Sequence, residues 1–265
     1  MFLIHNERMK TLKIVNKQIK RFIPILVVLI LWFIGSNFTN PLFLPQPQKV
    51  VSSFISLFEN GMWFESLYTS FFRITLATVM AALVSIPLGL LVANYKIIDD
   101  MITPVTGFMR FLPVTAFYPL LIMWVGIGET MKITFLFFAT FFYFLPTVIL
   151  SIKEVSADLI DTARTMGMSK VKVMTKVLLP ASLPSISQSF LMMYGIGWTY
   201  VILAETTNTN VGLGHLIHIG SARGRTDLVF VALITIVIFS YLFDLLCNYL
   251  IRKSFKWKFL REGKE

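Results

Sequence analysis

Long hydrophobic stretches separated by short polar segments dominate this chain of 265 residues. Six of the stretches approach or exceed the roughly 20 residues that a helix needs to cross a bilayer. The pattern therefore predicts an all-α membrane protein with six transmembrane helices, in a membrane domain that covers residues 22–251. The expected spans are Phe22–Phe38, Leu67–Asn94, Pro104–Val125, Ile133–Ile152, Leu183–Ala204 and Leu228–Ile251.

Two polar segments on one side of the predicted bilayer have helical character. Residues 49–59 carry apolar side chains at helical spacing, which predicts a surface helix along the membrane. Residues 211–218 combine a glycine turn with a short amphipathic helix that contains His215 and His218. Two histidines three residues apart can share a metal, but an exposed polar face is the more ordinary explanation, and we expect no metal site.

The positions of Lys and Arg predict the orientation of the spans. With the N-terminus inside, eighteen of the 24 basic residues lie on the cytoplasmic side and five on the other. Basic residues favour the cytoplasmic side, so both termini, 1–21 and 252–265, are expected in the cytoplasm. The first span lacks a small-residue cleavage site and is interpreted as an anchor. The net charge of +10 is explained by these flanks, without a nucleic-acid partner.

The loop between the fourth and fifth spans, residues 153–182, contains a short polar helix pattern. Ala163 and Gly167 are four residues apart and share one face, small enough for another protein to approach closely. Gly167 is placed to end the helix in a left-handed turn, and Ser169 to cap the next helix. The two prolines that follow, Pro180 and Pro184, mark where the chain returns to the bilayer.

This loop resembles the EAA loop of the membrane subunits of bacterial ABC importers. The matching residues are Asp161-Thr162-Ala163, Gly167 and Val177-Leu178-Leu179-Pro180, with aspartate for the usual glutamate and threonine for the usual middle alanine. In that family the segment is a coupling helix that docks in a groove of a cytoplasmic ATPase. The resemblance therefore implies ATPase-coupling roles for Asp161, Thr162, Ala163, Arg164, Gly167, Leu179 and Pro180. The alternative is an ordinary helix of a cytoplasmic loop.

The resemblance extends over roughly residues 40 to 260. The whole chain is similar to the branch of type I ABC importer permeases that serves nitrate, taurine, sulfonates and bicarbonate. The stretches that carry the likeness include 44–47, 70–73, 110–113, 125–129, 198–205 and 212–214. The resemblance implies a homodimeric permease, two ATPase subunits, an external or lipid-anchored substrate-binding protein and a small, anionic solute. The chain has no phosphate-binding loop of its own, so ATP and Mg are expected on the partner ATPase and no cofactor on this chain.

Charged residues in or beside the spans are candidates for translocation or gating, because burying a charge in a bilayer is costly. Arg110 and Asp244 are expected at a similar depth and are predicted to pair, unless each reaches water separately. Glu205 ends the fifth span, where it can gate the outer mouth, bond to Arg73, Arg223 or Arg225, or simply end the helix. Trp198 and Tyr200 line the same span as candidates, although aromatic residues there more often serve packing.

Two other classes of protein remain open from the residues alone. An ion-coupled secondary transporter usually shows internal repeats and acidic residues near the midplane, and no repeat is evident here. An intramembrane enzyme needs a catalytic constellation within the spans, but His5, His215 and His218 all fall outside them. The solute itself is not predicted by the sequence.

Overall fold

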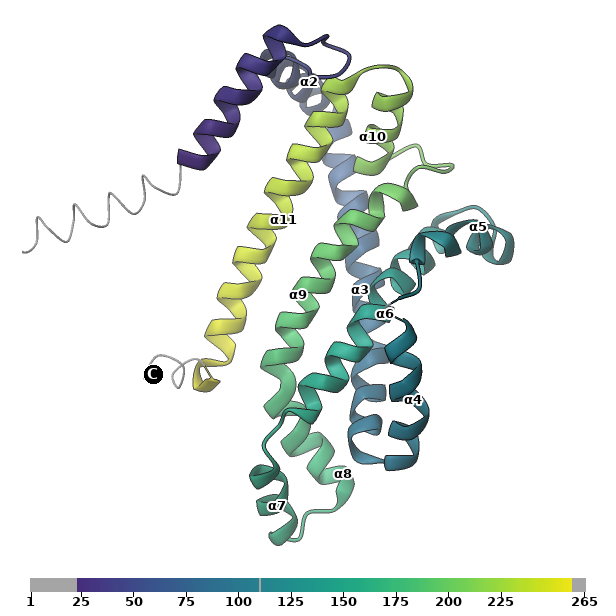
Figure 1. The fold of residues 1–265 in the computed structure, drawn as a ribbon, viewed down its shortest axis with the longest axis vertical. Coiled ribbons are helices and arrows are strands. Elements are labelled where there is room, and N and C mark those ends of the chain that lie inside the picture. Colours follow the sequence, from purple (N-terminus) through teal and green to yellow (C-terminus); the bar gives the residue numbers. More distant parts are fainter. Residues whose placement is uncertain (1–22, 110, 259–265) are drawn as a thin grey trace, which may run out of the picture.

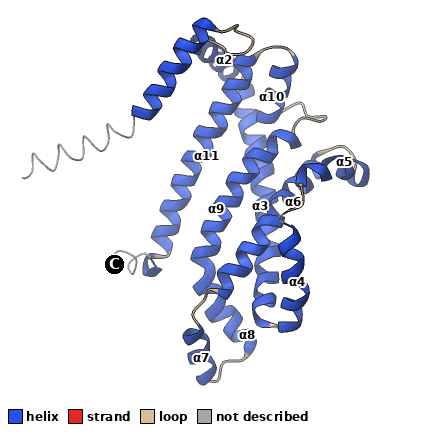
Figure 2. Cartoon of the chain, in the orientation of Figure 1, coloured by secondary structure: helices blue, strands red, loops and turns tan. Residues whose placement is uncertain are grey.

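The computed structural model describes residues 23–109 and 111–258, and this part of the chain is helical with short connections. Long helices run side by side between two ends of the molecule (Figure 1). One end carries α2 and α10, and the other carries α7 and α8. Figure 2 shows helices and loops throughout the described residues, so the all-α prediction is confirmed. The described helices are α2 Pro47–Glu59, α3 Met62–Asn94, α4 Lys96–Met109, α5 Val114–Val125, α6 Glu129–Lys153, α7 Ala157–Thr165, α8 Lys170–Val173, α9 Leu179–Ala204, α10 Leu213–Ala222 and α11 Thr226–Ser254.

Four predicted spans correspond to long apolar helices. These are α3, α6, the continuous helix Lys170–Ala204 and α11, which are the four described helices long and apolar enough to cross a membrane. The number rises to five if the bent pair α4 and α5 counts as one span. The first predicted span corresponds to a shorter apolar helix, Ile23–Phe38. The described residues thus support four or five spans, and the predicted number of six is not established.

The third predicted span, Pro104–Val125, is wrong as a single helix. The structure divides this stretch into α4 and α5, which meet at an angle of 103°. Pro113 explains the break, because a proline has no N–H to donate, its ring clashes with the carbonyl four residues earlier and it disfavours helical geometry in the residue before it. The residues on both sides of Pro113 are apolar, but the helix does not continue through this position.

Two of the three hydrophobic clusters in the described residues hold most of the long helices together. The larger one joins α2, α3, α5, α6, α9, α10 and α11 around buried residues such as Ile74, Phe135 and Trp198. The smaller one lies toward the α7 end and is built around Phe144, Val148 and Leu178. Close approach depends on small residues: a Cβ on Gly197 would come within 2.8 Å of the Ile74 side chain. The core therefore fixes α3, α6 and α9 as one packed group.

The helix predicted over residues 49–59 forms as α2, which buries Val50 and Leu57 in the larger cluster and also makes polar contacts with α11. The buried Ser53 hydroxyl donates to the Asp227 carboxylate at 2.6 Å, and Arg225 donates to the same oxygen at 2.5 Å. The hydrogen bond to Asp227, helped by the charge of that carboxylate, raises the pKa of Arg225 above its ordinary value although burial opposes this. This cluster fastens α2 to the start of α11.

Candidate functional site

The short polar helix between the fourth and fifth predicted spans forms as α7. Its C-terminus closes as expected, with Gly167 in the left-handed region at φ 78°. The N–H of Met168 donates to the carbonyl of Ala163, and the N–H of Gly167 donates to that of Arg164. These two bonds define a Schellman motif, which ends a helix and reverses the chain direction. Ser169 precedes α8 as predicted, but its side chain makes no capping hydrogen bond.

Ala163 points inward, which corrects the expectation that a partner protein presses against it, whereas Gly167, just beyond the end of α7, is exposed. Ala163 is 4% exposed and belongs to the cluster with Val173, Met174 and Leu178. The outward surface consists of the polar residues Asp161, Thr162 and Arg164 together with two exposed apolar side chains, Leu159 (52%) and Met166 (73%). Ala163 therefore anchors α7 to its own chain, and the neighbouring side chains are the ones available to another protein.

The connection from α7 into the membrane is one continuous helix. The run Lys170–Ala204 passes from α8 through a π-helical turn, Met174–Leu178, into α9. The N–H of Leu179 donates to the carbonyl of Met174, five residues earlier. This wider turn accommodates Pro180, which has no N–H of its own. Leu179 and Pro180 thus lie within the stiff rod that joins α8 to α9.

A buried ionic cluster occupies the opposite end of the molecule. Glu205, directly after α9, is 0% exposed. It accepts hydrogen bonds from Arg73 Nη1 at 2.7 Å, the Ser70 hydroxyl at 2.8 Å and the N–H of Gly214 at 2.8 Å. Gly214 lies in the first turn of α10, where free N–H groups and the helix dipole favour a negative charge. Glu205 therefore caps α10 and ties it to α3 and α9.

Arg73 extends this cluster to α6. Its guanidinium donates to both oxygens of Glu129, at 2.7 and 2.6 Å, while its third contact is Glu205. Lys132, 2% exposed, also donates to Glu129 at 2.9 Å. The positive charges of Arg73 and Lys132 are thus balanced by the carboxylates of Glu129 and Glu205. Charged side chains can be buried when they are paired and hydrogen-bonded in this way. The carboxylate of Glu129 is the accessible member, with a side chain that is 58% exposed.

Two glycines make room for the Glu205 carboxylate. A Cβ on Gly212 would lie 2.2 Å from Glu205 Oε2, and one on Gly214 would lie 2.9 Å from Glu205 Cβ. Gly212 also has φ 142°, in the region that L residues avoid. The sequence Gly212-Leu213-Gly214 is therefore the loop that lets α10 close over the carboxylate.

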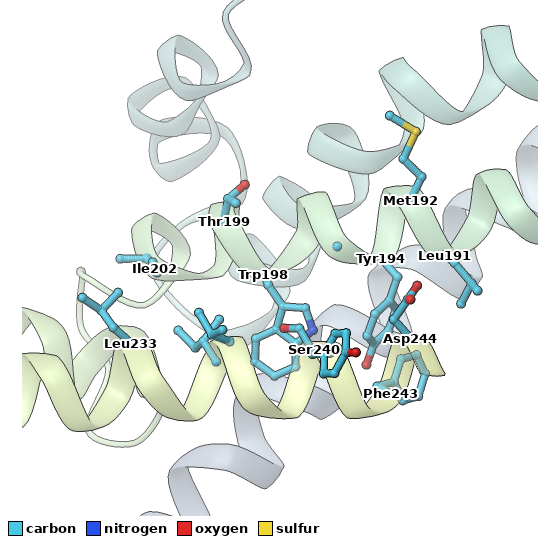
Figure 3. A pocket seen from close by; sticks show the side chains of 14 residues that line it. Leu191, Met192, Tyr194, Trp198, Thr199, Ile202, Leu233, Ser240, Phe243 and Asp244 are labelled. Atoms are coloured by element: carbon cyan, nitrogen blue, oxygen red, sulfur yellow. The ribbon is translucent and has the colours of Figure 1, made fainter. Parts of the chain in front are cut away.

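The remaining predicted residues fall in different places. Trp198 and Asp244 line a common pocket of about 640 Å³ between α9 and α11 (Figure 3). Tyr200 lies elsewhere, with its ring edge-on to Phe135 at a centroid distance of 6.0 Å. Arg110 lies outside the described residues, so its pairing with Asp244 stays a prediction. Asp244 itself accepts a hydrogen bond from Asn248 at 2.9 Å.

His215 and His218 lie on α10 as predicted. Burial lowers the pKa of His215 below its ordinary value, and the electrostatic influence of the neighbouring His218 and Lys132 lowers it further. Within the described ranges no group of three or more His, Cys, Asp and Glu side chains is placed to hold a metal ion.

The sequence analysis missed the full extent of the ionic cluster. It named Arg73 as one possible partner of Glu205 but gave no role to Ser70, Glu129 or Lys132. A signal was present, because Arg73 falls within the predicted second span, where an isolated charge calls for a partner. The identity of that partner depends on tertiary packing, since Arg73 and Glu205 are 132 residues apart.

The long apolar helices define a polytopic, all-α membrane protein. The family model for binding-protein-dependent transport system inner membrane components matches residues 85–256, and the chain belongs to this family. It is an integral membrane protein of the ABC importer permease class.

Individual relatives cover nearly the whole chain. The taurine transport system permease protein TauC of Escherichia coli is 29% identical over 96% of this chain and 95% of its own length. A putative ABC transporter permease of Methanocaldococcus jannaschii is 31% identical, with 94% and 96% covered. A putative aliphatic sulfonates transport permease, SsuC, of Bacillus subtilis is 28% identical, with 89% and 87% covered.

Solved structures show the same fold. The inward-facing MetNI methionine ABC transporter contains a chain that matches with a TM-score of 0.65 at 18% identity, covering 72% of this chain and 95% of that one. The expected likeness to type I importer permeases is therefore confirmed at the level of the fold.

Proposed function

We propose that this chain is the membrane-spanning subunit of an ATP-driven importer for small sulfonates, taurine among them. The observation that carries the proposal is α7, a capped helix packed on the chain's own core and joined directly to the rod Lys170–Ala204. The names of the relatives TauC and SsuC support the solute class. Nitrate and bicarbonate, which the resemblance also implies, are the competing solutes.

The surface of α7 suits an external protein. Leu159 and Met166 are both more than half exposed on this otherwise polar segment, which leaves their apolar surface available for a partner protein to bury. In the proposed mechanism a cytoplasmic ATPase subunit covers these side chains together with Asp161, Thr162 and Arg164. Movement of the ATPase then displaces α7, and the inward packing of Ala163 passes the displacement to α8 and α9.

In the proposed transporter the α7 end of the chain and both termini face the cytoplasm. The end with α2 and α10 faces outward, toward an external or lipid-anchored binding protein. Two copies of this chain form the permease dimer, with ATP and Mg held by two ATPase subunits. Alternating access requires that the two conformations of the permease differ in free energy of binding to the ATPase dimer. An ion-coupled transporter is the alternative, and the importer family membership argues against it.

Photo-crosslinking tests the docking surface. A photoreactive amino acid at position 159 or 166 should attach to the ATPase in membranes that contain the full complex. The matched control is position 64, whose Phe is 54% exposed near the start of α3, at the other end of the molecule. Equal attachment at positions 64 and 159, or none at 159 and 166, would refute the docking.

Transport is tested by reconstitution of the permease with its ATPase and binding protein. Labelled taurine and ethanesulfonate should accumulate in proteoliposomes only with ATP. Uptake that follows a proton gradient without the ATPase would favour the ion-coupled alternative.

A further inference from the structure

The last described turn of the chain crosses from α11 to the base of α9. α11 runs from the α10 end of the molecule toward the α7 end and stops at Ser254 (Figure 1). Residues 256–258 then form one more short helical turn. From this turn the ammonium group of Lys258 donates a hydrogen bond to the hydroxyl of Ser185, near the start of α9, at 2.7 Å. The end of the chain is therefore fastened to the base of the rod Lys170–Ala204.

This crossing leaves a notch of about 390 Å³ beside α7, which we call the C-terminal notch. Its lining combines apolar side chains with polar ones. The apolar part includes Leu159, Ala181 and Trp257, and the polar part includes Glu154, Ser156 and Lys258. Leu159 also belongs to the surface of α7 that the proposed function assigns to the ATPase. The notch is therefore continuous with that docking surface.

The two large apolar side chains of the notch are open to a partner. Trp257 is 54% exposed and Leu159 is 52% exposed, so the described part of the chain leaves about half of each uncovered. Apolar surface surrounded by polar groups is the usual anatomy of a protein interface, and tryptophan is among the residues that contribute most to binding.

A tryptophan beside a membrane span often lies in the interface with the lipid headgroups instead. The position of Trp257 argues against that explanation. It lines the same notch as Leu159 of α7, and α7 lies beyond the end of α6, away from the long apolar helices (Figure 1). The charged side chains of Glu154 and Lys258 line the notch as well. The notch thus belongs to a surface that a protein in the cytoplasm can reach.

We propose that the C-terminal notch is a second contact for the cytoplasmic ATPase subunit, which places a large apolar side chain against Leu159 and Trp257. This inference rests on the proposed function and extends the docking surface from α7 to the turn that follows α11. Because Lys258 joins this turn to Ser185, the ATPase then reaches α9 by two routes, through α7 and through the end of the chain.

Photo-crosslinking locates the contact. A photoreactive amino acid at position 257 should attach to the ATPase in membranes that contain the full complex. The matched control is position 249, whose Tyr is 63% exposed on α11, about two helical turns earlier, and lies outside the notch. A chain that ends at Lys258 should attach from position 257 as the full chain does, because it keeps every residue that lines the notch.

Affinity measurements test whether Trp257 contributes to binding. Trp257→Ala should weaken binding of the purified ATPase to the permease in detergent about tenfold or more, and Trp257→Phe should weaken it less. Tyr249→Ala is the matched control and should bind as the wild type does. Detergent removes the bilayer, so a tryptophan that only anchors the chain at the lipid headgroups predicts no loss of affinity. If Trp257→Ala fails to fold, the crosslink at position 257 decides the question.

Several results would overturn the inference and leave the proposed function standing, provided that positions 159 and 166 attach to the ATPase. One is attachment at position 257 that is no stronger than at position 249, or that goes to a second copy of this chain. Another is wild-type affinity in Trp257→Ala. Loss of the attachment in the chain that ends at Lys258 would assign the contact to residues 259–265 and not to the notch. Failure of positions 159 and 166 to attach would refute the proposed docking, and this inference with it.

Discussion

Replacing Glu205 with glutamine tests whether the buried ionic cluster holds the outer end of the fold together. The carboxylate of Glu205 faces donors on both oxygens: Oε1 meets Arg73, and Oε2 meets the N–H of Gly214, with Ser70 near both. A glutamine side chain has one oxygen and one NH₂ group. In either orientation its NH₂ replaces an acceptor and points at a donor, so at least one hydrogen bond is lost and a buried donor remains unpaired.

The magnitude follows from the burial of the cluster. An unpaired buried donor costs about 1–3 kcal/mol. Removing one partner of a buried ion pair costs about 3–5 kcal/mol in all. Glu129 keeps part of the Arg73 charge compensated, which places the expected loss of unfolding free energy for Glu205→Gln at about 3 kcal/mol. Loss of the cap on α10 contributes to this value.

Glu129→Gln is the matched control, because it makes the same chemical change on the other partner of Arg73. The side chain of Glu129 is 58% exposed, and water can replace its lost bonds. We therefore expect a loss of about 1 kcal/mol or less, as for exposed ion pairs. Unfolding of the purified protein in detergent, followed by circular dichroism against denaturant, measures both variants.

The ranking of these two variants is the decisive result. If Glu129→Gln destabilises the protein as much as Glu205→Gln, burial does not determine the strength of the cluster and the reasoning fails. If Glu205→Gln is fully stable but transport is lost, Glu205 acts as a gate and not as a structural cap.

Further substitutions test the glycine and polar contacts separately. Gly212→Ala should destabilise the protein more than Gly167→Ala in the same denaturation assay, because its Cβ would meet Glu205 Oε2 whereas a Cβ on Gly167 meets nothing within 4 Å. Gly167→Ala should cost about 1 kcal/mol from its left-handed backbone alone, and equal losses for the two would contradict the packing argument. Asp227→Asn should loosen α2 and raise proteolytic cleavage near residue 60, and unchanged cleavage would refute that role. Because the pKa of His215 is lowered in the folded protein, the unfolded chain binds the proton more tightly. The free energy of unfolding should therefore decrease as the pH falls below the ordinary pKa of histidine, about 6.5. The His215→Gln variant should lose less stability over the same pH range.

The long spans were predictable because uninterrupted apolar sequence leaves few alternatives to a helix in a membrane. The predicted Ile133–Ile152 lies within α6, and the predicted Leu183–Ala204 ends at the same residue as α9. Hydrophobicity alone could not find the break at Pro113, because the residues on either side remain apolar. Proline alone does not single out this position either, because Pro87, Pro146 and Pro184 lie inside continuous helices of the same structure.

The α7 segment shows a different limit of sequence reasoning. Spacing showed that Ala163 and Gly167 share a face, and Gly167 does end the helix as expected. Spacing does not show which neighbour covers that face. Small residues permit close packing equally well against a partner and against the same chain, and here Val173 and Leu178 share a buried cluster with Ala163 while Gly167 stays exposed.

The two ends of the rod Lys170–Ala204 constrain how force can pass through the proposed transporter. At one end α7 packs on the turn that enters the rod, and at the other Glu205 is locked to Arg73 on α3 and to the start of α10. Sliding of α9 past α3 would separate the buried charges at a cost of several kcal/mol, whereas tilting α3, α9 and α10 together keeps every one of these bonds. The salt bridge from Arg73 to Glu129 reaches α6 through the more exposed carboxylate, so it is the bond that yields at lower cost. A displacement of α7 is therefore expected to tilt α3, α9 and α10 together with α6, because buried residues at the start of α6, such as Phe135, pack in the same core as α3 and α9.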